Sequence, residues 1–306
     1  MTQVWLPSGD DGNIAGLPTS LEVYVGSTPP AAIETVEFFV PGLDSWGRLR
    51  ELIPQMTGLR VIQTLSAGVD LVPRDLLGPD VVLCNAAGVH DTAVAEMAAT
   101  LILCSLRGIP DFLEAQSNRQ WLQNEWTRVP QRTSLADHRV LIIGFGRIGA
   151  ALERRLLPFE CDVVKIARHP REGVLGLSEL QRELPLADIV VLLVPLTTET
   201  EAIANTDFLA RMKDGALLVN LGRGKLVDTN ALIAELNAGR ITAALDAVDP
   251  EPLPVEHPLW LTPGVMITPH IAGSATARLP RLHGLIREQL RRFASGESLL
   301  NVVSAH

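Results

Sequence analysis

Residues 141–149 read L-I-I-G-F-G-R-I-G, and this stretch decides the fold class. The apolar run Val140–Ile143 predicts a short buried strand, and Ala150–Leu157, which ends before Pro158, predicts a helix. Between them, Gly144, Gly146 and Gly149 have the G-x-G-x-x-G spacing. In a strand–turn–helix unit the first glycine permits the sharp bend and the second lets the backbone approach a pyrophosphate. The third allows close helix–strand packing, and the helix N-terminus faces the phosphates. The stretch therefore predicts a dinucleotide-binding turn.

Strands and helices are expected to alternate along the whole chain. Short apolar runs predict five strands in the N-terminal part, at Val4–Leu6, Leu21–Val25, Val36–Val40, Leu59–Leu65 and Val81–Cys84. After the glycine turn, further strands are predicted at Val163–Ala167, Ile189–Val194, Ala216–Leu221, Ile241–Ala247 and Val265–Thr268. Short buried strands that alternate with helices are typical of parallel sheets. The expected fold class is α/β, with two doubly wound, Rossmann-like parallel-sheet domains.

Composition excludes several classes of function. The chain has 306 residues, a net charge of −9 and 47% hydrophobic residues, with no run of about 18 apolar residues to span a bilayer. The negative charge argues against a nucleic-acid or anionic-membrane partner, because phosphate binding needs a basic face. The three cysteines form no C-x-x-C pair, and we see no basic and apolar leader at the N-terminus. We therefore expect reduced thiols and a cytoplasmic location. The histidines have no metal-ligand spacing, so we expect no metal.

Several further motifs carry a family resemblance. Residues 219–228 read V-N-L-G-R-G-K-L-V-D, residues 246–254 read D-A-V-D-P-E-P-L-P, and residues 267–273 read I-T-P-H-I-A-G. L-S-A-G-V-D stands at 65–70, V-A-E at 94–96 and P-L-T-T-E-T at 195–200. In content, order and spacing these segments resemble the D-isomer-specific 2-hydroxyacid dehydrogenases over essentially the whole chain. Within that family the chain looks most like the glyoxylate/hydroxypyruvate reductase branch.

The resemblance implies a catalytic set of Arg223, Glu251 and His270, which stand on the matching motif positions. Reduction of a 2-oxo acid needs a fixed carboxylate, a polarised carbonyl and a proton. The planar guanidinium of Arg223 suits the carboxylate and carbonyl oxygens. His270 can carry a proton near neutral pH and suits the role of general acid. Glu251 can orient the imidazole and favour its protonated form.

The resemblance also implies the binding residues around this set. Ala67, Gly68 and Val69 would line the substrate carboxylate site together with Arg223, because small side chains leave backbone N–H groups open to an anion. The implied cofactor contacts, besides the three glycines, are Arg147, Ile148, Pro195, Thr200, Leu221 and Asp246. Of these, Asp246 matches the family aspartate that meets the nicotinamide carboxamide.

The end of the second strand of the dinucleotide unit departs from the NAD-specific pattern. NAD-specific members carry an acidic residue about 20 residues beyond the glycines, where it binds the ribose 2′-hydroxyl. Here the strand ends in Arg168-His169-Pro170-Arg171. Arg168 can pair with a 2′-phosphate, with His169 beside it, and Arg171 adds positive charge. We therefore expect NADP(H) to be preferred over NAD(H), the alternative being solvated loop residues in an enzyme that uses NADH.

The motif positions set the expected domain organisation. We assign residues 1–89 and 276–306 to a flavodoxin-like substrate-binding domain and residues 90–275 to the dinucleotide-binding domain. The amphipathic helix predicted over Leu279–Phe293 returns to the first domain, and the active site is expected in the cleft. The family's dimers pair around the long apolar helix, so Val94–Leu106 is the expected homodimer interface. The segment Ser117–Asp137, with Trp121, Trp126 and Pro130, is expected to be irregular.

The expected function is NADPH-dependent reduction of a small 2-oxo acid, of the glyoxylate or hydroxypyruvate type, to the D-2-hydroxy acid. Reduction of bulkier 2-oxo acids such as phenylpyruvate is an open alternative. A second alternative is a non-enzymatic, nucleotide-sensing protein like the corepressors that share this fold. A phosphoglycerate-type dehydrogenase is disfavoured because the sequence shows no extra C-terminal regulatory domain.

Overall fold

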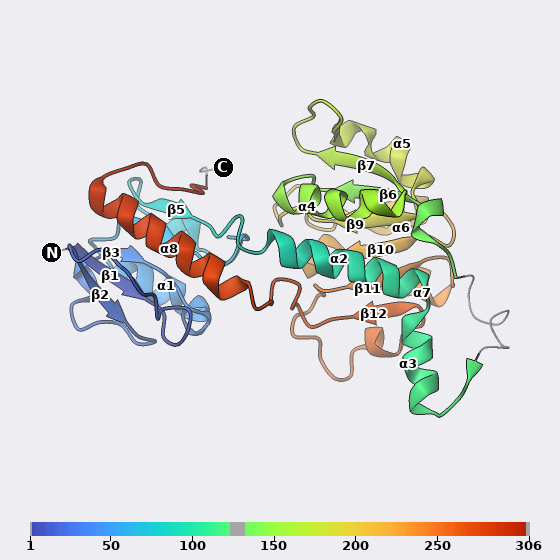
Figure 1. Ribbon diagram of the computed structural model, residues 1–306, viewed down its shortest axis with the longest axis horizontal. Helices are drawn as coiled ribbons and strands as arrows, with labels where there is room; N and C mark the ends of the chain where they lie inside the picture. The colour runs from blue at the N-terminus through green and yellow to red at the C-terminus, as the bar shows by residue number, and fades with distance from the viewer. Residues whose placement is uncertain (1, 123–131, 304–306) are drawn as a thin grey trace. The chain divides into compact units, whose positions relative to one another are not determined.

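The computed structural model describes residues 2–122 and 132–303 (Figure 1). The chain divides into two compact units. Unit 1 comprises residues 1–90 and 274–306, and unit 2 comprises residues 91–273. Because unit 1 is built from both ends of the chain, its last helix is added after the whole of unit 2 in sequence order.

Unit 1 contains a parallel sheet of five strands in the order β2-β1-β3-β4-β5 within the described residues. The strands are β1 (Thr2–Leu6), β2 (Leu21–Val25), β3 (Val36–Phe39), β4 (Val61–Gln63) and β5 (Val82–Cys84). The strand order reverses between β1 and β3, as in flavodoxin-like sheets, and ligand sites in such sheets lie at the carboxyl ends of the strands. The loop that follows β4, with Ala67–Val69, lies at this edge.

The two faces of the smaller sheet pack against different helices. Alternate residues such as Val4 and Phe38 pack with Leu282, Ile286 and Leu290 of α8 (Arg278–Ser295). Their neighbours Trp5 and Phe39 pack on the opposite face with α1 (Leu49–Leu52). In Figure 1, α8 runs along the smaller sheet, as expected from the amphipathic pattern of its sequence. The last helix therefore belongs to the core of the first unit.

Unit 2 contains a parallel sheet of seven strands in the order β12-β11-β10-β9-β6-β7-β8 within the described residues. The strands are β6 (Arg139–Ile143), β7 (Asp162–Ala167), β8 (Leu175–Gly176), β9 (Ile189–Leu192), β10 (Leu217–Asn220), β11 (Thr242–Leu245) and β12 (Val265–Ile267). The order reverses between β6 and β9. The glycine turn follows β6, so it lies at the switch point where doubly wound sheets bind nucleotides.

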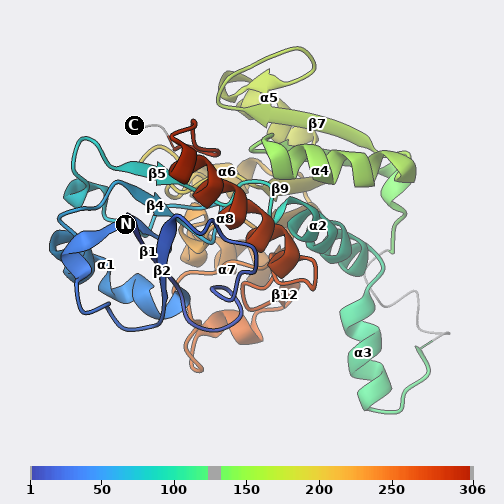
Figure 2. The same cartoon turned by 60° about the vertical axis from the view of Figure 1, so that its left-hand side comes forward.

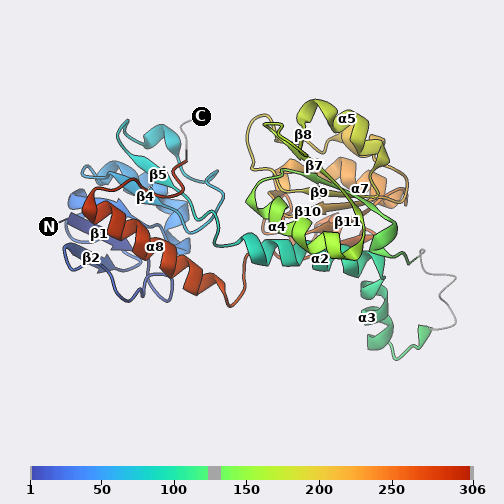
Figure 3. The same cartoon turned by 45° about the horizontal axis from the view of Figure 1, so that its top comes forward.

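Helices cover both faces of the larger sheet (Figure 3). Its helices are α2 (Asp91–Leu106), α3 (Ile109–Ser117), α4 (Arg147–Leu156), α5 (Leu180–Glu183), α6 (Thr206–Arg211) and α7 (Thr229–Asn237). Val140 and Ile142 of β6 pack with α2 and α4, whereas Leu141 and Ile143 pack with α6 and α7. This two-sided burial explains why β6 is a continuous apolar run rather than an alternating one.

The main departure from the sequence prediction is α3. The apolar helix predicted through Leu106 does end there as α2, but a further helix, which was not predicted, begins at Ile109. Gly108 has a φ of +62°, which turns the chain, and Pro110 lies in the first helical turn, where its missing N–H costs nothing. Figure 2 shows α3 projecting from the end of α2, and the two are bent by 69°.

Smaller departures concern element ends and connections. The two-residue strand β8 was not predicted, and β4 is shorter than the apolar run Leu59–Leu65. A short 3-10 helix, Leu135–Asp137, lies in the segment expected to be irregular, whereas Trp126 and Pro130 lie outside the described residues. No single helix in the described ranges is long and apolar enough to cross a membrane, although α2 and α3 pass that test as a bent pair.

Candidate active site

The glycine turn after β6 is shaped by two of its three glycines. Gly144 has a φ of +103°, and a Cβ there would lie 2.5 Å from the carbonyl carbon of Leu193. A Cβ on Gly149 would lie 3.1 Å from the carbonyl oxygen of Gly144, because α4 packs closely on β6. Position 144 therefore requires glycine, and at Gly149 a larger residue would push its close neighbours by a few tenths of an ångström.

Gly146 has a different environment. It has a negative φ of −98°, and a Cβ on it would meet no protein atom within 4 Å. It precedes Arg147 and Ile148, the first residues of α4, whose N–H groups have no acceptor within the helix. Open space and free N–H groups at a helix N-terminus fit a pyrophosphate. Among the three glycines of the turn, Gly146 is the one at which no protein atom would meet a Cβ within 4 Å, and its predicted contact with the cofactor stays a prediction.

The basic residues that follow β7 lie beside the glycine turn. Arg171 donates through Nη2 to the carbonyl oxygen of Phe145 at 2.7 Å, and its guanidinium carbon lies 5.5 Å from the centre of the Phe145 ring. Arg168 and His169 are exposed. The pKa of Glu199 is below its usual value, chiefly because the Thr197 hydroxyl donates to its carboxylate, then through its backbone N–H and the charge of Arg168. The charge of Arg168 thus acts on the Glu199 carboxylate, and its predicted contact with a 2′-phosphate stays a prediction.

The loop after β9 is closed by Thr200. Its hydroxyl donates to the carbonyl oxygen of Pro195 at 2.6 Å and accepts from the N–H of Thr197 at 2.8 Å. Leu221, which follows β10, is 8% exposed. The structure thus gives Thr200 a role in the shape of the loop, and the predicted contacts of Pro195, Thr200 and Leu221 with a cofactor stay predictions.

Arg223 is held by a turn that depends on Asn220. The fully buried amide of Asn220 donates to the carbonyl oxygens of Arg223 at 2.9 Å and Ala247 at 3.1 Å, and accepts from the N–H of Gly222 at 3.1 Å. A Cβ on Gly224 would lie 1.9 Å from the carbonyl oxygen of Val248. Arg223 itself is half-buried, and its Nη1 donates to the carbonyl oxygen of Gly222 at 2.9 Å. These bonds therefore fix the backbone position from which the Arg223 side chain extends.

His270 and Glu251 form a hydrogen-bonded pair. Nδ1 of His270 lies 2.6 Å from Oε1 of Glu251, and both side chains are about two-fifths exposed, at 38% and 41%. Because an ionised carboxylate can only accept, Nδ1 carries a proton in this pair. This leaves Nε2 as the ring atom that can exchange a proton with a ligand. An imidazole oriented in this way can act as a general acid or base toward a bound ligand.

Asp246 organises the loop that carries His270. Its buried carboxylate accepts from the Thr268 hydroxyl at 2.6 Å and from the N–H groups of Ile271 at 3.0 Å and Ala272 at 2.9 Å. The N–H of His270 donates to the carbonyl oxygen of Asp246 at 2.8 Å, and His270 has a left-handed φ of +53°. The sequence predicted a cofactor contact for Asp246, whereas its observed bonds hold the His270 loop. The predicted contact with a nicotinamide stays a prediction.

The loop Leu65–Val69 in unit 1 has its carbonyl groups turned into the protein. The carbonyl oxygens of this loop accept bonds from His90, Thr64, Asn85, Ser66 and Val72. Among the described residues, none accepts from the N–H groups of Ala67, Gly68 and Val69. Consecutive backbone N–H groups without an internal acceptor are suited to bind an anion. The predicted contact of Ala67–Val69 with a substrate carboxylate stays a prediction.

The comparisons with known proteins agree with this geometry. Residues 99–272 match the family model described as "D-isomer specific 2-hydroxyacid dehydrogenase, NAD binding domain". The chain belongs to this family. A mouse glyoxylate reductase/hydroxypyruvate reductase is 37% identical over 229 residues, which are 71% of this chain and 68% of the mouse protein.

Two solved structures extend the comparison to the whole chain. A D-isomer specific 2-hydroxyacid dehydrogenase from Xanthobacter autotrophicus, crystallised with NADPH, has a TM-score of 0.81 and 31% identity, and the match covers 99% of this chain and 98% of that one. The NADPH-dependent glyoxylate/hydroxypyruvate reductase of Sinorhizobium meliloti, with NADP and malonate, has a TM-score of 0.79 and 25% identity, with 99% and 97% coverage. This dehydrogenase is therefore an oxidoreductase with a nicotinamide-binding domain.

In this dehydrogenase the structure brings some predicted residues together and adds others. Arg223, Glu251, His270 and Asp246 all follow strands at the carboxyl edge of the larger sheet. Within the described part of the chain, no group of three His, Cys, Asp or Glu residues could hold a metal. Sequence reasoning missed Asn220, whose position directly before L-G-R-G was the available signal. The expectation that Ala67–Val69 and Arg223 act in one cleft stays a prediction.

We expect a Gly146→Ala variant of the dehydrogenase to fold normally and to bind its cofactor about 10- to 100-fold more weakly. The added methyl group meets no protein atom, but it would occupy the space that faces the pyrophosphate, and overpacking of about 1–3 kcal/mol is typical of such a clash. Fluorescence titration with NADPH and thermal unfolding measure the two effects. Gly149→Ala is the matched control, because it should lower the melting temperature. Unchanged affinity in Gly146→Ala would contradict this assignment.

We expect Asp246→Asn to lower the free energy of unfolding by about 1–3 kcal/mol, because an amide NH2 would face a buried N–H donor. The rate of turnover should fall as well, since the same bonds hold the His270 loop. Thr268→Val, which removes one of the three donors, is the milder control and should lose less of both quantities. Denaturant unfolding and kcat measure the two effects. Equal losses in the two variants would show that the backbone bonds of Asp246 contribute little.

Proposed function

We propose that this dehydrogenase reduces a small 2-oxo acid, of the glyoxylate or hydroxypyruvate type, to the D-2-hydroxy acid with NADPH. The His270–Glu251 pair carries this proposal, because an imidazolium held through Nδ1–H can donate its second proton, on Nε2, to a carbonyl oxygen and become neutral. A bound nicotinamide supplies the hydride in this chemistry. Electrons and protons then balance, since the carbonyl carbon gains the hydride and the oxygen gains the proton of His270.

The remaining roles follow from charge and hydrogen-bonding capacity. The free N–H groups of Ala67–Val69 bind the substrate carboxylate, and the guanidinium of Arg223 binds carboxylate and carbonyl oxygens. Arg223 also stabilises the charge that develops on the carbonyl oxygen in the transition state. Glu251 keeps the imidazole in the donating orientation. No residue of this set needs a metal ion to perform its step.

NADPH is the proposed cofactor because of the basic end of β7. NAD-specific enzymes carry an acidic residue at the end of this strand to bind the ribose hydroxyls, whereas this chain has the exposed Arg168 there. Arg171 is held beside the glycine turn by its bond to Phe145. The Xanthobacter structure contains NADPH and the Sinorhizobium structure contains NADP, and both support this choice.

The substrate is the part of the proposal that one experiment decides. Purified enzyme is supplied with glyoxylate, hydroxypyruvate and phenylpyruvate in turn, with NADPH or NADH, and NADPH absorbance is followed. We expect the two small acids with NADPH to have the highest kcat/KM. A higher kcat/KM for phenylpyruvate would replace the substrate and leave the reaction class intact. Absence of any turnover, together with tight nucleotide binding, would favour a nucleotide-sensing protein.

We further propose a homodimer that pairs through α2 at Val94–Leu106. Apolar side chains of this helix remain only partly buried, including those of Met97, Leu103 and Leu106. Burial of a helix that is apolar on nearly all sides between subunits removes this surface from water. Light scattering of the eluted protein should give twice the chain mass, and Met97→Glu should reduce it to the single-chain value. A monomeric wild-type protein would refute this interface.

A further inference from the structure

A row of buried polar side chains lies behind the loop Leu65–Val69 in unit 1. Gln63 donates through Nε2 to the carbonyl oxygen of Thr64 at 2.8 Å, and the Thr64 hydroxyl donates to that of Ser66 at 2.8 Å. The Ser66 hydroxyl donates in turn to the carbonyl oxygen of Gly68 at 2.6 Å. Gln63 and Thr64 are both fully buried. These bonds fix the direction of the loop carbonyls, and because a trans peptide is planar, the N–H of each such peptide group points the opposite way.

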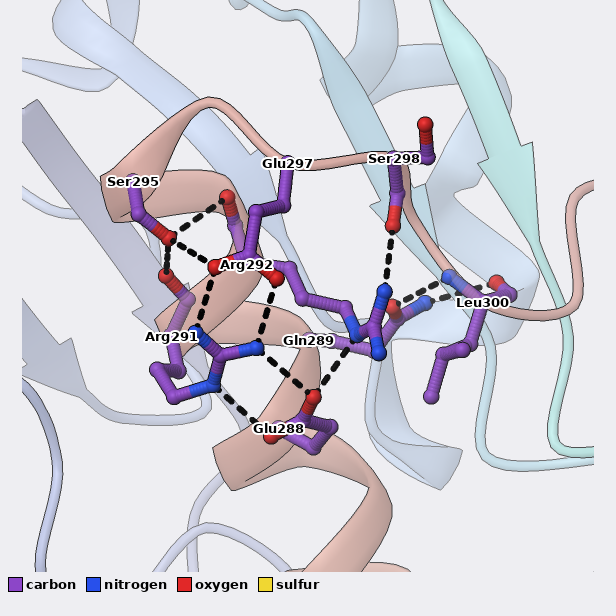
Figure 4. Close-up of polar contacts among 8 residues, drawn as sticks. All are labelled: Glu288, Gln289, Arg291, Arg292, Ser295, Glu297, Ser298 and Leu300. Atoms are coloured by element: carbon purple, nitrogen blue, oxygen red, sulfur yellow. Dashed lines mark hydrogen bonds and ion pairs between the residues drawn. The ribbon is translucent and has the colours of Figure 1, made fainter.

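The row continues into the last helix through Gln289. Its fully buried amide donates through Nε2 to Oε1 of Gln63 at 2.7 Å, across 226 residues of sequence. The same amide donates to the carbonyl oxygen of Leu300 at 2.9 Å and accepts from its N–H at 2.8 Å (Figure 4). Burial raises the pKa of the neighbouring Cys84 thiol to about 11, with the Gln289 hydrogen bond acting in the opposite direction. The row is therefore uncharged at neutral pH.

The C-terminal segment reaches the same loop by a second route. After Leu300 the chain pairs with the end of β5, where the N–H of Asn85 donates to the carbonyl oxygen of Asn301 at 3.1 Å and Val303 donates to Leu83 at 2.8 Å. The amide of Asn85 then donates to the carbonyl oxygen of Ala67 at 2.9 Å. The segment 300–303 is thus linked to the loop through Asn85.

A cluster of charges fixes the turn between α8 and this segment (Figure 4). Arg291 bridges Glu288 and Glu297 with contacts of 2.6 to 3.0 Å, and Arg292 donates to the carbonyl oxygen of Ser298 at 3.0 Å. Hydrogen bonds from Arg291, followed by those from Arg292 or Ser295, lower the pKa of Glu288 and of Glu297 to about 2. Because both pKa values are depressed, the cluster stays ionised at neutral pH and weakens as pH falls from about 4.5 toward 2.

We propose that Gln289 and the segment 300–303 are positioning elements for the substrate-binding loop, and that they set the orientation of its N–H groups. The proposal rests on the proposed function, because it takes this loop as the carboxylate site. Two apolar residues would fill the space of Gln63 and Gln289 at less cost, since each buried amide must find partners. The two amides instead join α8 to Thr64 by hydrogen bonds, and the hydroxyls of Thr64 and Ser66 continue this chain of bonds to Gly68.

Three variants separate positioning from stability. Gln289→Met removes the amide and leaves Gln63 and Leu300 without their partner, so both stability and positioning should suffer. The double variant Gln63→Met with Gln289→Met removes both amides, which restores stability in part but not the bond to Thr64. Leu282→Ala, on the same helix and in the same core, lowers stability without touching the row.

The readouts are the KM for glyoxylate, the affinity for NADPH, the melting temperature, and hydrogen exchange in residues 64–72 and 84–87. We expect kcat/KM to fall about 10- to 100-fold in both glutamine variants, mainly through KM, with NADPH affinity unchanged. Exchange at the N–H groups of Ala86 and Val72, which donate to the loop carbonyls, should quicken. Leu282→Ala should lower the melting temperature while KM and these exchange rates stay at wild-type values.

Each outcome decides the proposal. A wild-type KM in the double variant, or a KM in Leu282→Ala that rises as much as in Gln289→Met, would overturn the positioning role. If the wild-type enzyme reduces no 2-oxo acid, the proposed function fails, and the exchange rates then decide the positioning alone. Quickened exchange confined to the glutamine variants supports it, and equal exchange in all variants refutes it.

Discussion

A His270→Gln variant is expected to bind NADPH normally and to lose about 10²–10⁴-fold in kcat for 2-oxo acid reduction. Glutamine keeps a polar side chain of similar reach but cannot release a proton at neutral pH. The backbone conformation should survive, because the N–H of residue 270 donates to Asp246 and Thr268 whatever its side chain. Stopped-flow or steady-state NADPH oxidation gives the rate, and nucleotide titration gives the affinity.

The control for this variant is His138→Gln, which removes an imidazole that bonds to Ser134 and Thr133 before β6. It should leave kcat unchanged. If His270→Gln keeps more than about a tenth of the wild-type kcat, another group delivers the proton, because general acids typically supply at least a hundredfold. Glu251→Gln offers a graded comparison, since it weakens the orientation of His270 and keeps the proton donor.

The second large effect is expected from Arg168→Asp, which should weaken NADPH by about 10- to 150-fold and improve NADH. One charged contact with a phosphate corresponds to roughly 1.5–3 kcal/mol, and an introduced carboxylate can accept from the ribose hydroxyl instead. The preference between the two cofactors, measured as the ratio of their kcat/KM values, should therefore invert. The charge of Arg168 lowers the pKa of Glu199, and in this variant a negative charge would replace it.

Arg154→Asp is the matched control, because it makes the same charge change on an exposed residue in the last turn of α4. This helix runs back along the sheet from the glycine turn, so its last turn lies at the opposite edge. The control should leave cofactor preference unchanged. Equal kcat/KM with NADPH and NADH in the wild-type enzyme would contradict the role of Arg168.

The fold was predictable because its signals are local. Strands buried on both faces, such as β6 and β9, are short apolar runs, and Gly144 stands where only glycine fits. The helix α3 was missed because Gly108 and Pro110 are typical of a helix end. Here the left-handed glycine ends one helix and the proline begins the next, and composition alone does not distinguish these cases.

The candidate site was predictable to a lesser degree. The order of Arg223, Glu251 and His270 in the sequence indicated the candidate catalytic side chains. The 2.6 Å bond between His270 and Glu251 was not predictable, because it depends on how two loops fold. The bonds of Asp246 to the His270 loop and the contact of Gln289 with Gln63 join residues far apart in sequence. No spacing rule covers such contacts, because they are set by the packing of whole elements.

The division of unit 1 between the two ends of the chain has a consequence for biosynthesis. Unit 2 is continuous, so all of its strands leave the ribosome before α8 is made. At about 5–20 residues per second, the first sheet waits about 10–40 s for the helix that covers one of its faces. During that interval Val4, Phe38 and Val61 lack the apolar partners that α8 later brings. We therefore expect a chaperone that binds apolar surface to act on the nascent N-terminal sheet during this interval, before α8 covers it.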